Sequence, residues 1–297
     1  MKSTAPRLFI VDVFAERAYD GNPLAVVIGA DGFSDEAMQR FAAEMNFSET
    51  SFVGRAAEAD GGYRARIFTP SREIAFAGHP ILGTAWVVRH GIAANNPELV
   101  RLNLSVGQVP VHFEADGAGA ETAWFLAPPV TLGPTCARER IAPALGISAG
   151  DIESGFPVQQ LASGTAAMIV PLRGLDALGR SRLDLAVFAP LAAEGFPPLV
   201  YLFCTQARDS RNDLCARFFF ESHGVREDPA TGNGAAFLGA YLLEHKVFPA
   251  STSSWRIEQG YELRRPSVVH LRARWVGSTP EIRVGGKVIA TVQGELL

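Results

Sequence analysis

Short segments rich in β-branched and aromatic residues alternate with turn residues along the first quarter of the chain. The apolar segments are RLFIVDVFA (7–15), LAVVIG (24–29), ETSFVG (49–54) and YRARIFTP (63–70). Turn residues bound them, as in DGNP (20–23) and DGG (60–62). This pattern predicts β-strands joined by tight turns.

Two kinds of helix are predicted between the strands. Residues 34–46 place Met38, Phe41 and Met45 at helical spacing, and Ser34 or Asp35 is a suitable N-cap. In contrast, ILGTAWVVRHG (81–91), which follows Pro80, is apolar on almost every side, and so is the segment 234–245. A helix that is apolar on every side is expected to be buried on every side.

The second half of the chain repeats this order of elements. VQQLASGTAAMIVPL (158–172) is similar in type to AEMNFSETSFV (43–53), and CARFFF (215–220) stands where RARIFTP (64–70) stood. DPATGNGAAFLGAYLLEHK (228–246) then gives a Gly-rich turn before an apolar helix. Superposing Gly78 on Gly232, an offset of 232 − 78 = 154 residues, places His79 over Asn233. An internal repeat is therefore a hypothesis, whose alternative is that buried helices simply resemble one another.

Two further segments are predicted from composition. FEADGAGAETAWFLAPPVTLGP (113–134) is rich in Gly, Ala and Pro and is the best candidate for a linker. EIRVGGKVIATVQGEL (281–296) is typical of a hairpin with a Gly-Gly turn.

Composition narrows the class of protein. The chain has 297 residues, 47% of them hydrophobic, which is enough for one or two cores. Its net charge is 27 − 31 = −4 with no basic stripe, which argues against nucleic-acid binding. The three cysteines form no CxxC pair, the N-terminus has no signal-peptide pattern, and no apolar run reaches the roughly 18–20 residues of a membrane span. We therefore expect a cytoplasmic protein without membrane contact.

Glu49 is the first candidate for chemistry. It directly precedes the apolar strand TSFV (50–53). Burial there would raise the pKa of its carboxyl toward neutral pH, where it could accept and return a proton. The alternative is an exposed glutamate at a strand edge.

His79, in AGHP (77–80), is the second candidate. It is expected at or near the N-cap of the buried helix, with Pro80 at the first helical position. Helix N-termini attract anions, and Gly78 lets a ligand approach the backbone closely. The alternative is a histidine that only caps its own helix or satisfies a polar group in the core.

The third candidate is EDPATGNGAA (227–236), which contains Asp228, Gly232, Asn233 and Gly234. This turn could present several backbone N–H groups to a carboxylate or phosphate. It lacks the lysine of a P-loop and the GxGxxG spacing, so nucleotide binding fits poorly. The alternative is a plain Asp-Pro turn whose glycines start a helix.

Five stretches are informative when taken together: VDVFAERAYDGNPLAVV, MNFSETSFV, RIFTPSREIAFAGHPILGTA, EDPATGNGAA and IEQGYELRRPS. In this order, over almost the whole chain, they resemble the phenazine-biosynthesis isomerase (PhzF-like) family. The resemblance implies an α+β fold similar to diaminopimelate epimerase. In that fold two pseudo-symmetric domains each wrap a curled β-sheet around a central helix, and the active site lies in the cleft at the helix N-termini. The implied domains are residues 1–118, with the tail of about 285–297 returning to it, and residues 119–297.

The resemblance also implies residue roles in a cofactor-independent proton shift on a small carboxylic acid. Glu49 matches the general acid/base of the family, and His79 and Asp228 match polar groups that assist proton transfer. Gly78 and Gly232 match backbone positions that line the pocket. No metal is implied, and a homodimer is expected from the family.

Two departures from the family pattern leave the substrate open. Asn233 stands where the family usually has Ser, although its amide can still form hydrogen bonds beside Gly234. Arg264 stands where a Gly is expected. These two departures therefore affect the identity of the acid more than the reaction class.

Two other functions remain open at this stage. One is a racemase or epimerase of an amino-acid-like acid, with Glu49 opposed by His79 or Asp228. Its thiol version is disfavoured, because no cysteine lies near either turn. The other is a small-molecule binding protein on the same fold without turnover.

Overall fold

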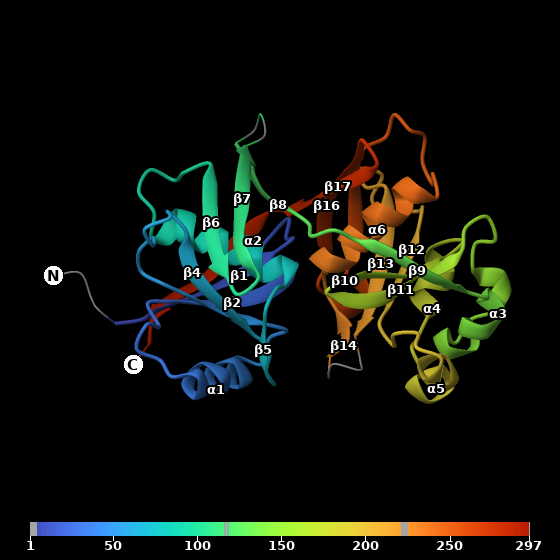
Figure 1. Ribbon diagram of the computed structural model, residues 1–297, viewed down its shortest axis with the longest axis horizontal. Helices are drawn as coiled ribbons and strands as arrows, with labels where there is room; N and C mark the ends of the chain where they lie inside the picture. The colour runs from blue at the N-terminus through green and yellow to red at the C-terminus, as the bar shows by residue number, and fades with distance from the viewer. Residues whose placement is uncertain (1–4, 116, 118, 221–224, 297) are drawn as a thin grey trace. The chain divides into compact units, whose positions relative to one another are not determined.

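The computed structural model describes residues 5–115, 117, 119–220 and 225–296. Contacts divide the chain into two compact units, Met1–Leu126 with Gly285–Leu297, and Ala127–Val284 (Figure 1). The predicted domain limits stay a prediction, because a compact unit of contacts and an independently folding domain are different properties. Among the described residues, no helix is long and apolar enough to cross a membrane.

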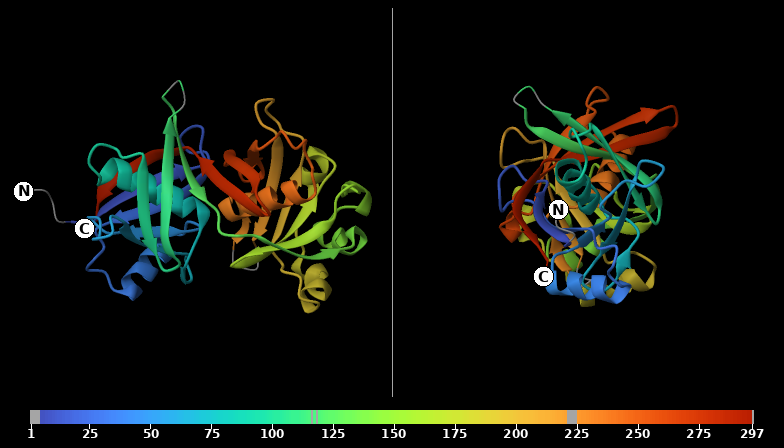
Figure 2. Two further views of the ribbon diagram at one scale, coloured as in Figure 1. Left: turned by 45° about the horizontal axis from the view of Figure 1, so that its top comes forward. Right: turned by 90° about the vertical axis from the view of Figure 1, so that its left-hand side faces the viewer.

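The first unit wraps its strands around one helix. β1 pairs antiparallel with β2 and β18, β2 pairs parallel with β3, and β3 pairs antiparallel with β4. β4 pairs antiparallel with β5 and parallel with β6, and β6, β7 and β8 form an antiparallel meander. Helix α2 packs against strands from both ends of this order (Figure 2). The elements are β1 (Arg7–Val13), β2 (Asn22–Ile28), α1 (Asp35–Met45), β3 (Thr50–Val53), β4 (Tyr63–Phe68), β5 (Glu73–Ile74), α2 (Gly78–Gly91), β6 (Leu99–Leu104), β7 (Gly107–Ala115), β8 (Glu121–Leu126) and β18 (Val288–Glu295).

The second unit is built in the same way around α6. β10 pairs antiparallel with β9 and β11, β11 pairs parallel with β12, and β12 pairs antiparallel with β13. β13 pairs antiparallel with β14 and parallel with β15, which pairs antiparallel with β16. The elements are β9 (Thr131–Cys136), α3 (Arg138–Ile141), β10 (Val158–Ser163), β11 (Thr165–Pro171), α4 (Leu175–Arg180), α5 (Leu185–Ala193), β12 (Val200–Cys204), β13 (Leu214–Phe220), β14 (Val225–Asp228), α6 (Gly232–Glu244), β15 (Ser254–Gln259), β16 (Ser267–Val276) and β17 (Thr279–Gly286).

The two pairing schemes are the same step by step, which confirms the predicted internal repeat. In each unit an antiparallel pair (β1–β2 or β10–β11) leads through helical segments to a parallel partner (β3 or β12). The next strand (β4 or β13) pairs antiparallel with that partner and forms a hairpin with a short strand (β5 or β14). The central helix follows, and the strand after it (β6 or β15) pairs in parallel with β4 or β13. The predicted two-domain α+β fold is therefore confirmed.

The two central helices are buried, as their apolar sequences predict, but both begin earlier than expected. α2 starts at Gly78 and α6 at Gly232, so His79 is the second residue of its helix rather than the N-cap. Pro80 is the third residue of α2. A proline is tolerated there because the first four N–H groups of a helix have no intrahelical partner. The N-cap of α1 is Ser34, whose hydroxyl accepts from Ala37 N.

Three segment predictions were wrong in detail. The predicted linker 113–134 does contain the boundary between the two units, at Leu126 and Ala127, but most of its residues belong to strands β7, β8 and β9. Residues 158–172 form two strands joined at Gly164, which has φ +73°, and are therefore equivalent to β1 and β2 rather than to residues 43–53. The glycines of the predicted hairpin turn lie inside β17, and β18 pairs with β1. A Cβ on Gly285 would meet the Trp124 ring, and one on Gly286 the Phe14 ring, so close packing requires these glycines.

Candidate active site

Glu49 lies where the chain enters the sheet of the first unit. Helix α1 ends at Asn46, which adopts the left-handed conformation with φ 52° and turns the chain back. Three residues separate Asn46 from Thr50, where β3 begins and pairs in parallel with β2. The Glu49 side chain is 15% exposed, so the alternative of a freely exposed strand-edge glutamate does not hold.

His79 brings this carboxyl into contact with the start of α2. Its Nε2 lies 3.5 Å from Glu49 Oε2, and its Nδ1 lies 3.3 Å from Asn22 Nδ2. Because an amide nitrogen donates, Nδ1 is the acceptor and the ring proton is assigned to Nε2, which faces the carboxyl. The three side chains therefore lie in one row, and with Asn22 Nδ2 as the donor the ring N–H of His79 faces Glu49.

Burial decides the charge of this histidine. The side chain is 4% exposed, and loss of solvation lowers the pKa of His79 to about 3. The imidazole is therefore neutral near pH 7. Its approach to Glu49 is a contact between a neutral N–H donor and a carboxyl group rather than an ion pair, although the distance alone would also suit an ion pair.

The N-termini of α2 and α6 differ from those of two other helices in how they are capped. Side chains cap α1 through Ser34 and α5 through Asp184. Among the described residues, no side chain caps α2 at Ala77 or α6 at Thr231. The backbone N–H groups at these two ends are donors without an intrahelical acceptor, and the positive end of each helix dipole adds to them. Both ends can therefore receive an anion.

In the second unit, Asp228 is held by the turn that leads into α6. Thr231 Oγ1 donates to Asp228 Oδ2 at 2.5 Å. The hydroxyl of this N-cap residue therefore binds the carboxyl and does not cap α6. The buried Gln259 Nε2 donates to the backbone oxygen of Asp228 at 2.9 Å, and Gln259 Oε1 accepts from Thr231 N at 3.3 Å. Asp228 is thus fixed through both its side chain and its backbone.

The remaining predicted residues form the first turn of α6. Gly232 and Gly234 are buried, and Asn233 is half-buried as the second residue of its helix, the same position that His79 has in α2. A Cβ on Gly234 would overlap the ring of Tyr201, so this position must be glycine. The hydroxyl of Tyr201 is buried, and within the described part of the chain it has no hydrogen-bond partner.

The structure places the predicted residues at or next to the starts of β3, α2 and α6, in contact with residues that sequence analysis had not singled out. The structure groups Glu49, Gly78 and His79 in the first unit, and Asp228, Gly232, Asn233 and Gly234 in the second. The supports that went unnoticed are Asn22, Thr231 and Gln259. Asn22 was considered only as a turn residue, although it is the first residue of β2 and fully buried. A polar residue inside an otherwise apolar strand is the signal that could have identified it.

Comparison with known proteins establishes the family. The model of the family described as phenazine biosynthesis-like protein matches residues 11–294. The chain belongs to this phenazine biosynthesis-like family. The predicted family resemblance is therefore confirmed.

Individual relatives agree with this assignment. The chain is 35% identical over 289 residues to an uncharacterized isomerase of Pasteurella multocida, covering 97% of this chain and 92% of the relative. It is 34% identical over 291 residues to the trans-2,3-dihydro-3-hydroxyanthranilate isomerase of Pseudomonas aeruginosa, covering 97% and 98%. A crystal structure of a PhzF-family phenazine biosynthesis protein of Bacillus anthracis matches with a TM-score of 0.88 at 25% identity and full coverage of both chains. These relatives support the predicted enzyme class, an isomerase of the phenazine biosynthesis-like family.

Proposed function

We propose that this protein catalyses a cofactor-independent proton shift on a small carboxylic acid, with Glu49 as the general acid/base. The observation that carries the proposal is the row of three contacting side chains, Asn22, His79 and Glu49, at the uncapped N-terminus of α2. Glu49 is 15% exposed and lies beside the neutral His79, and a carboxylate in such a position can accept a proton and return it. An isomerisation needs such a group, because the proton that leaves one carbon must be delivered to another.

The steps balance without a redox partner. The Glu49 carboxylate removes a proton from one carbon of the acid, and the electron pair moves along the conjugated system. The resulting carboxylic acid, which is partly exposed to solvent, then delivers its proton, or a deuteron after exchange in D₂O, to a second carbon. His79, whose Nε2 lies 3.5 Å from Glu49 Oε2, stays neutral during these steps, because its low pKa makes proton transfer to the ring unfavourable.

Binding of the acid is proposed to use the uncapped helix ends. The N–H groups at the start of α2, around Gly78, are donors for a carboxylate. Asp228, Gly232, Asn233 and Gly234 are proposed as further substrate-contacting residues, supported by the uncapped start of α6. The compound acted on by the Pseudomonas aeruginosa relative, trans-2,3-dihydro-3-hydroxyanthranilate, is the first substrate to test.

The test is Glu49→Gln, assayed in D₂O with that compound. We expect turnover and deuterium incorporation to fall by about 10²–10⁴-fold, the usual contribution of a general acid/base. The matched control is Glu44→Gln, which changes an exposed glutamate of α1 and should leave both rates unchanged. Full activity of Glu49→Gln would contradict the proposal. Inversion at one carbon instead of double-bond migration would indicate a racemase or epimerase, and tight binding without turnover would indicate a binding protein.

A further inference from the structure

A four-residue pattern recurs at equivalent positions of the two units. It is Ala-Arg-Ile-Phe at residues 65–68 of β4 and Ala-Arg-Phe-Phe at residues 216–219 of β13. In both strands the arginine lies between two pairings. β4 pairs with β6 before Arg66 and with β5 after it, and β13 pairs with β15 before Arg217 and with β14 after it. The two arginines are therefore equivalent in the internal repeat.

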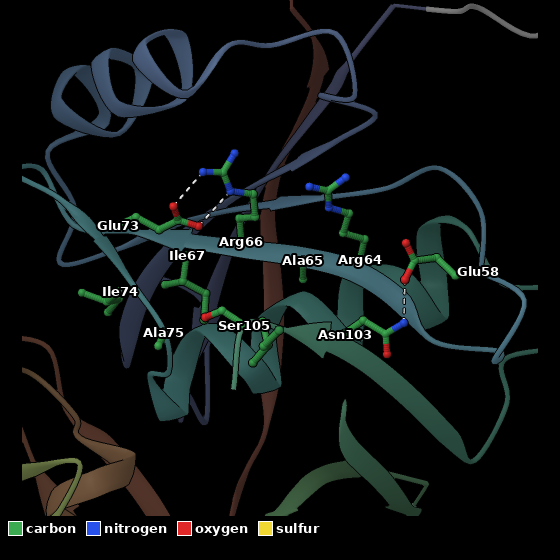
Figure 3. Close-up of a pocket in the computed structure, with 11 residues that line it drawn as sticks. Glu58, Arg64, Ala65, Arg66, Ile67, Glu73, Ile74, Ala75, Asn103 and Ser105 are labelled. Atoms are coloured by element: carbon green, nitrogen blue, oxygen red, sulfur yellow. Dashed lines mark hydrogen bonds and ion pairs between the residues drawn. The ribbon is translucent and has the colours of Figure 1, made fainter. Parts of the chain in front are cut away.

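Each arginine makes the same two-pronged contact with a glutamate of the following strand. Arg66 Nε and Nη2 donate to Glu73 Oε1 and Oε2 at 2.8 and 2.6 Å (Figure 3). Arg217 Nε and Nη2 donate to Glu227 Oε1 and Oε2 at 2.9 and 2.7 Å. We call each of these contacts a fork. Each guanidinium also lies over a phenylalanine ring two residues on, at 5.1 Å from Phe68 and 4.8 Å from Phe219.

Both forks stand at the same distance along the chain from a central helix. Glu73 precedes Gly78 by 78 − 73 = 5 residues, and Glu227 precedes Gly232 by 232 − 227 = 5 residues. In the second unit Asp228 directly follows the fork glutamate. Because successive side chains of a strand point to opposite faces, Glu227 reaches Arg217 while Asp228 faces Thr231. The two neighbouring carboxyl groups are therefore held from opposite faces of one strand, by Arg217 and by Thr231.

Each fork borders a cavity, so packing surrounds it on some sides only. A cavity of about 330 Å³ is lined by Arg66 and Glu73, and one of about 340 Å³ by Arg217 and Glu227. A side chain that borders such a space has room to move once its partner is removed. A charge-assisted bidentate contact supplies the orientation that packing does not.

Each fork also reaches a helix on the outer side of its strands. Arg66 Nη1 donates to Asp35 Oδ1, in the first turn of α1, at 2.6 Å. Arg217 Nη1 donates to the carbonyl oxygens of Leu178 and Ser181, at the end of α4, at 2.9 Å each. The second fork is almost fully buried, whereas Glu73 is 40% exposed.

We infer that the two forks are matched positioning devices. Each fork fixes the hairpin that precedes α2 or α6, and thereby the position of the first turn of that helix. This inference rests on the proposed function for the identity of the side chains it positions, His79 and Asp228. The fork residues are proposed to act only through these groups. The prediction is that loss of a fork loosens the first turn of its own helix and leaves the rest of that helix in place.

The test is amide hydrogen exchange of the whole protein, which needs no substrate. For Glu227→Gln we expect exchange in the first two turns of α6 to rise by about tenfold relative to its last turn, with α2 unchanged. Glu73→Gln should do the same in α2, by a smaller factor of about threefold, because this fork is partly hydrated. Arg66→Lys, which keeps the charge but loses the two-pronged geometry, should match Glu73→Gln.

The matched control is Glu281→Gln, which breaks another arginine–glutamate contact between strands, Arg274 Nη2 to Glu281 Oε1 at 2.9 Å, that leads to no helix. It should leave both helices unchanged. Equal acceleration of the first and last turns, or no acceleration in any fork variant, would overturn the inference. If Glu227→Gln does not fold, the partly exposed Glu73 fork decides the outcome. Exchange does not depend on turnover, so a failure of the Glu49 assay and a failure here are separate results.

Discussion

The chemistry of the candidate site depends on how one histidine is kept neutral. His79 is enclosed by the first turn of α2, by Asn22 and by Glu49, and it has almost no contact with solvent. Burial lowers the pKa of His79 to about 3, against an ordinary value of 6.5. A neutral ring adds no positive charge beside Glu49. In the proposed function, the depressed pKa also keeps His79 from competing with Glu49 for the proton.

The same burial predicts a pH dependence of stability. Between about pH 6.5 and 3 the unfolded chain protonates this histidine and the folded chain does not. Stability from His79 is thus fully present above pH 6.5 and decreases as the pH falls toward 3, by up to about 1.4 kcal/mol per pH unit. The free energy of unfolding of His79→Gln, measured by denaturant titration, should therefore fall less between pH 7 and 5 than that of the parent protein. The control His112→Gln changes an exposed histidine and should keep the parent dependence. Identical pH slopes in all three proteins would contradict the assignment.

At the scale of elements, the sequence was informative about type and order but less so about limits. The two central helices were identified because their apolar residues cover every side, and the structure buries both. Their first residues were misplaced because Pro80 suits a helix start as well as the third position. The forks were out of reach of sequence analysis, since an Arg and a Glu seven or ten residues apart meet only through strand register. The buried role of Asn22 depends in the same way on the position of His79.

The two forks should differ sharply in their effect on stability. Arg217→Met leaves Glu227, 5% exposed, as a buried charge without its cation, which typically costs about 3–5 kcal/mol. Arg66→Met leaves Glu73, 40% exposed, in contact with water, and should cost about 0–1 kcal/mol. Urea denaturation monitored by tryptophan fluorescence measures both, with the exposed Arg274→Met as control. Equal losses in the two fork variants would show that burial does not govern their energetics.

At the scale of the whole chain, the sheet of the first unit is completed by the last strand. β18 pairs antiparallel with β1 from Arg7↔Glu295 to Val13↔Val288, and Leu296 N donates to Pro6 O at 2.8 Å. The first and last strands of the sequence thus lie side by side within the first unit (Figure 1). The Gly-Gly pair predicted a hairpin because glycine favours turns. The actual reason for the two glycines is the closeness of the Trp124 and Phe14 rings, which only the folded structure brings next to them.

This arrangement predicts that the tail is indispensable to the first unit although it is the last part of the chain. Ending the chain after Gly286 removes β18 and leaves the backbone groups of β1 along that edge without partners. An unpaired edge of this length favours association with other chains, and the apolar residues that β18 covers become exposed. We expect most of the truncated protein to be insoluble, and its soluble fraction to be cleaved by protease within residues 5–126 first. Ending the chain after Glu295 keeps every β1–β18 pair and should leave solubility and protease resistance unchanged. A soluble, protease-resistant protein lacking residues 287–297 would show instead that the first unit folds without its last strand, and that the pairing with β1 contributes little to its stability.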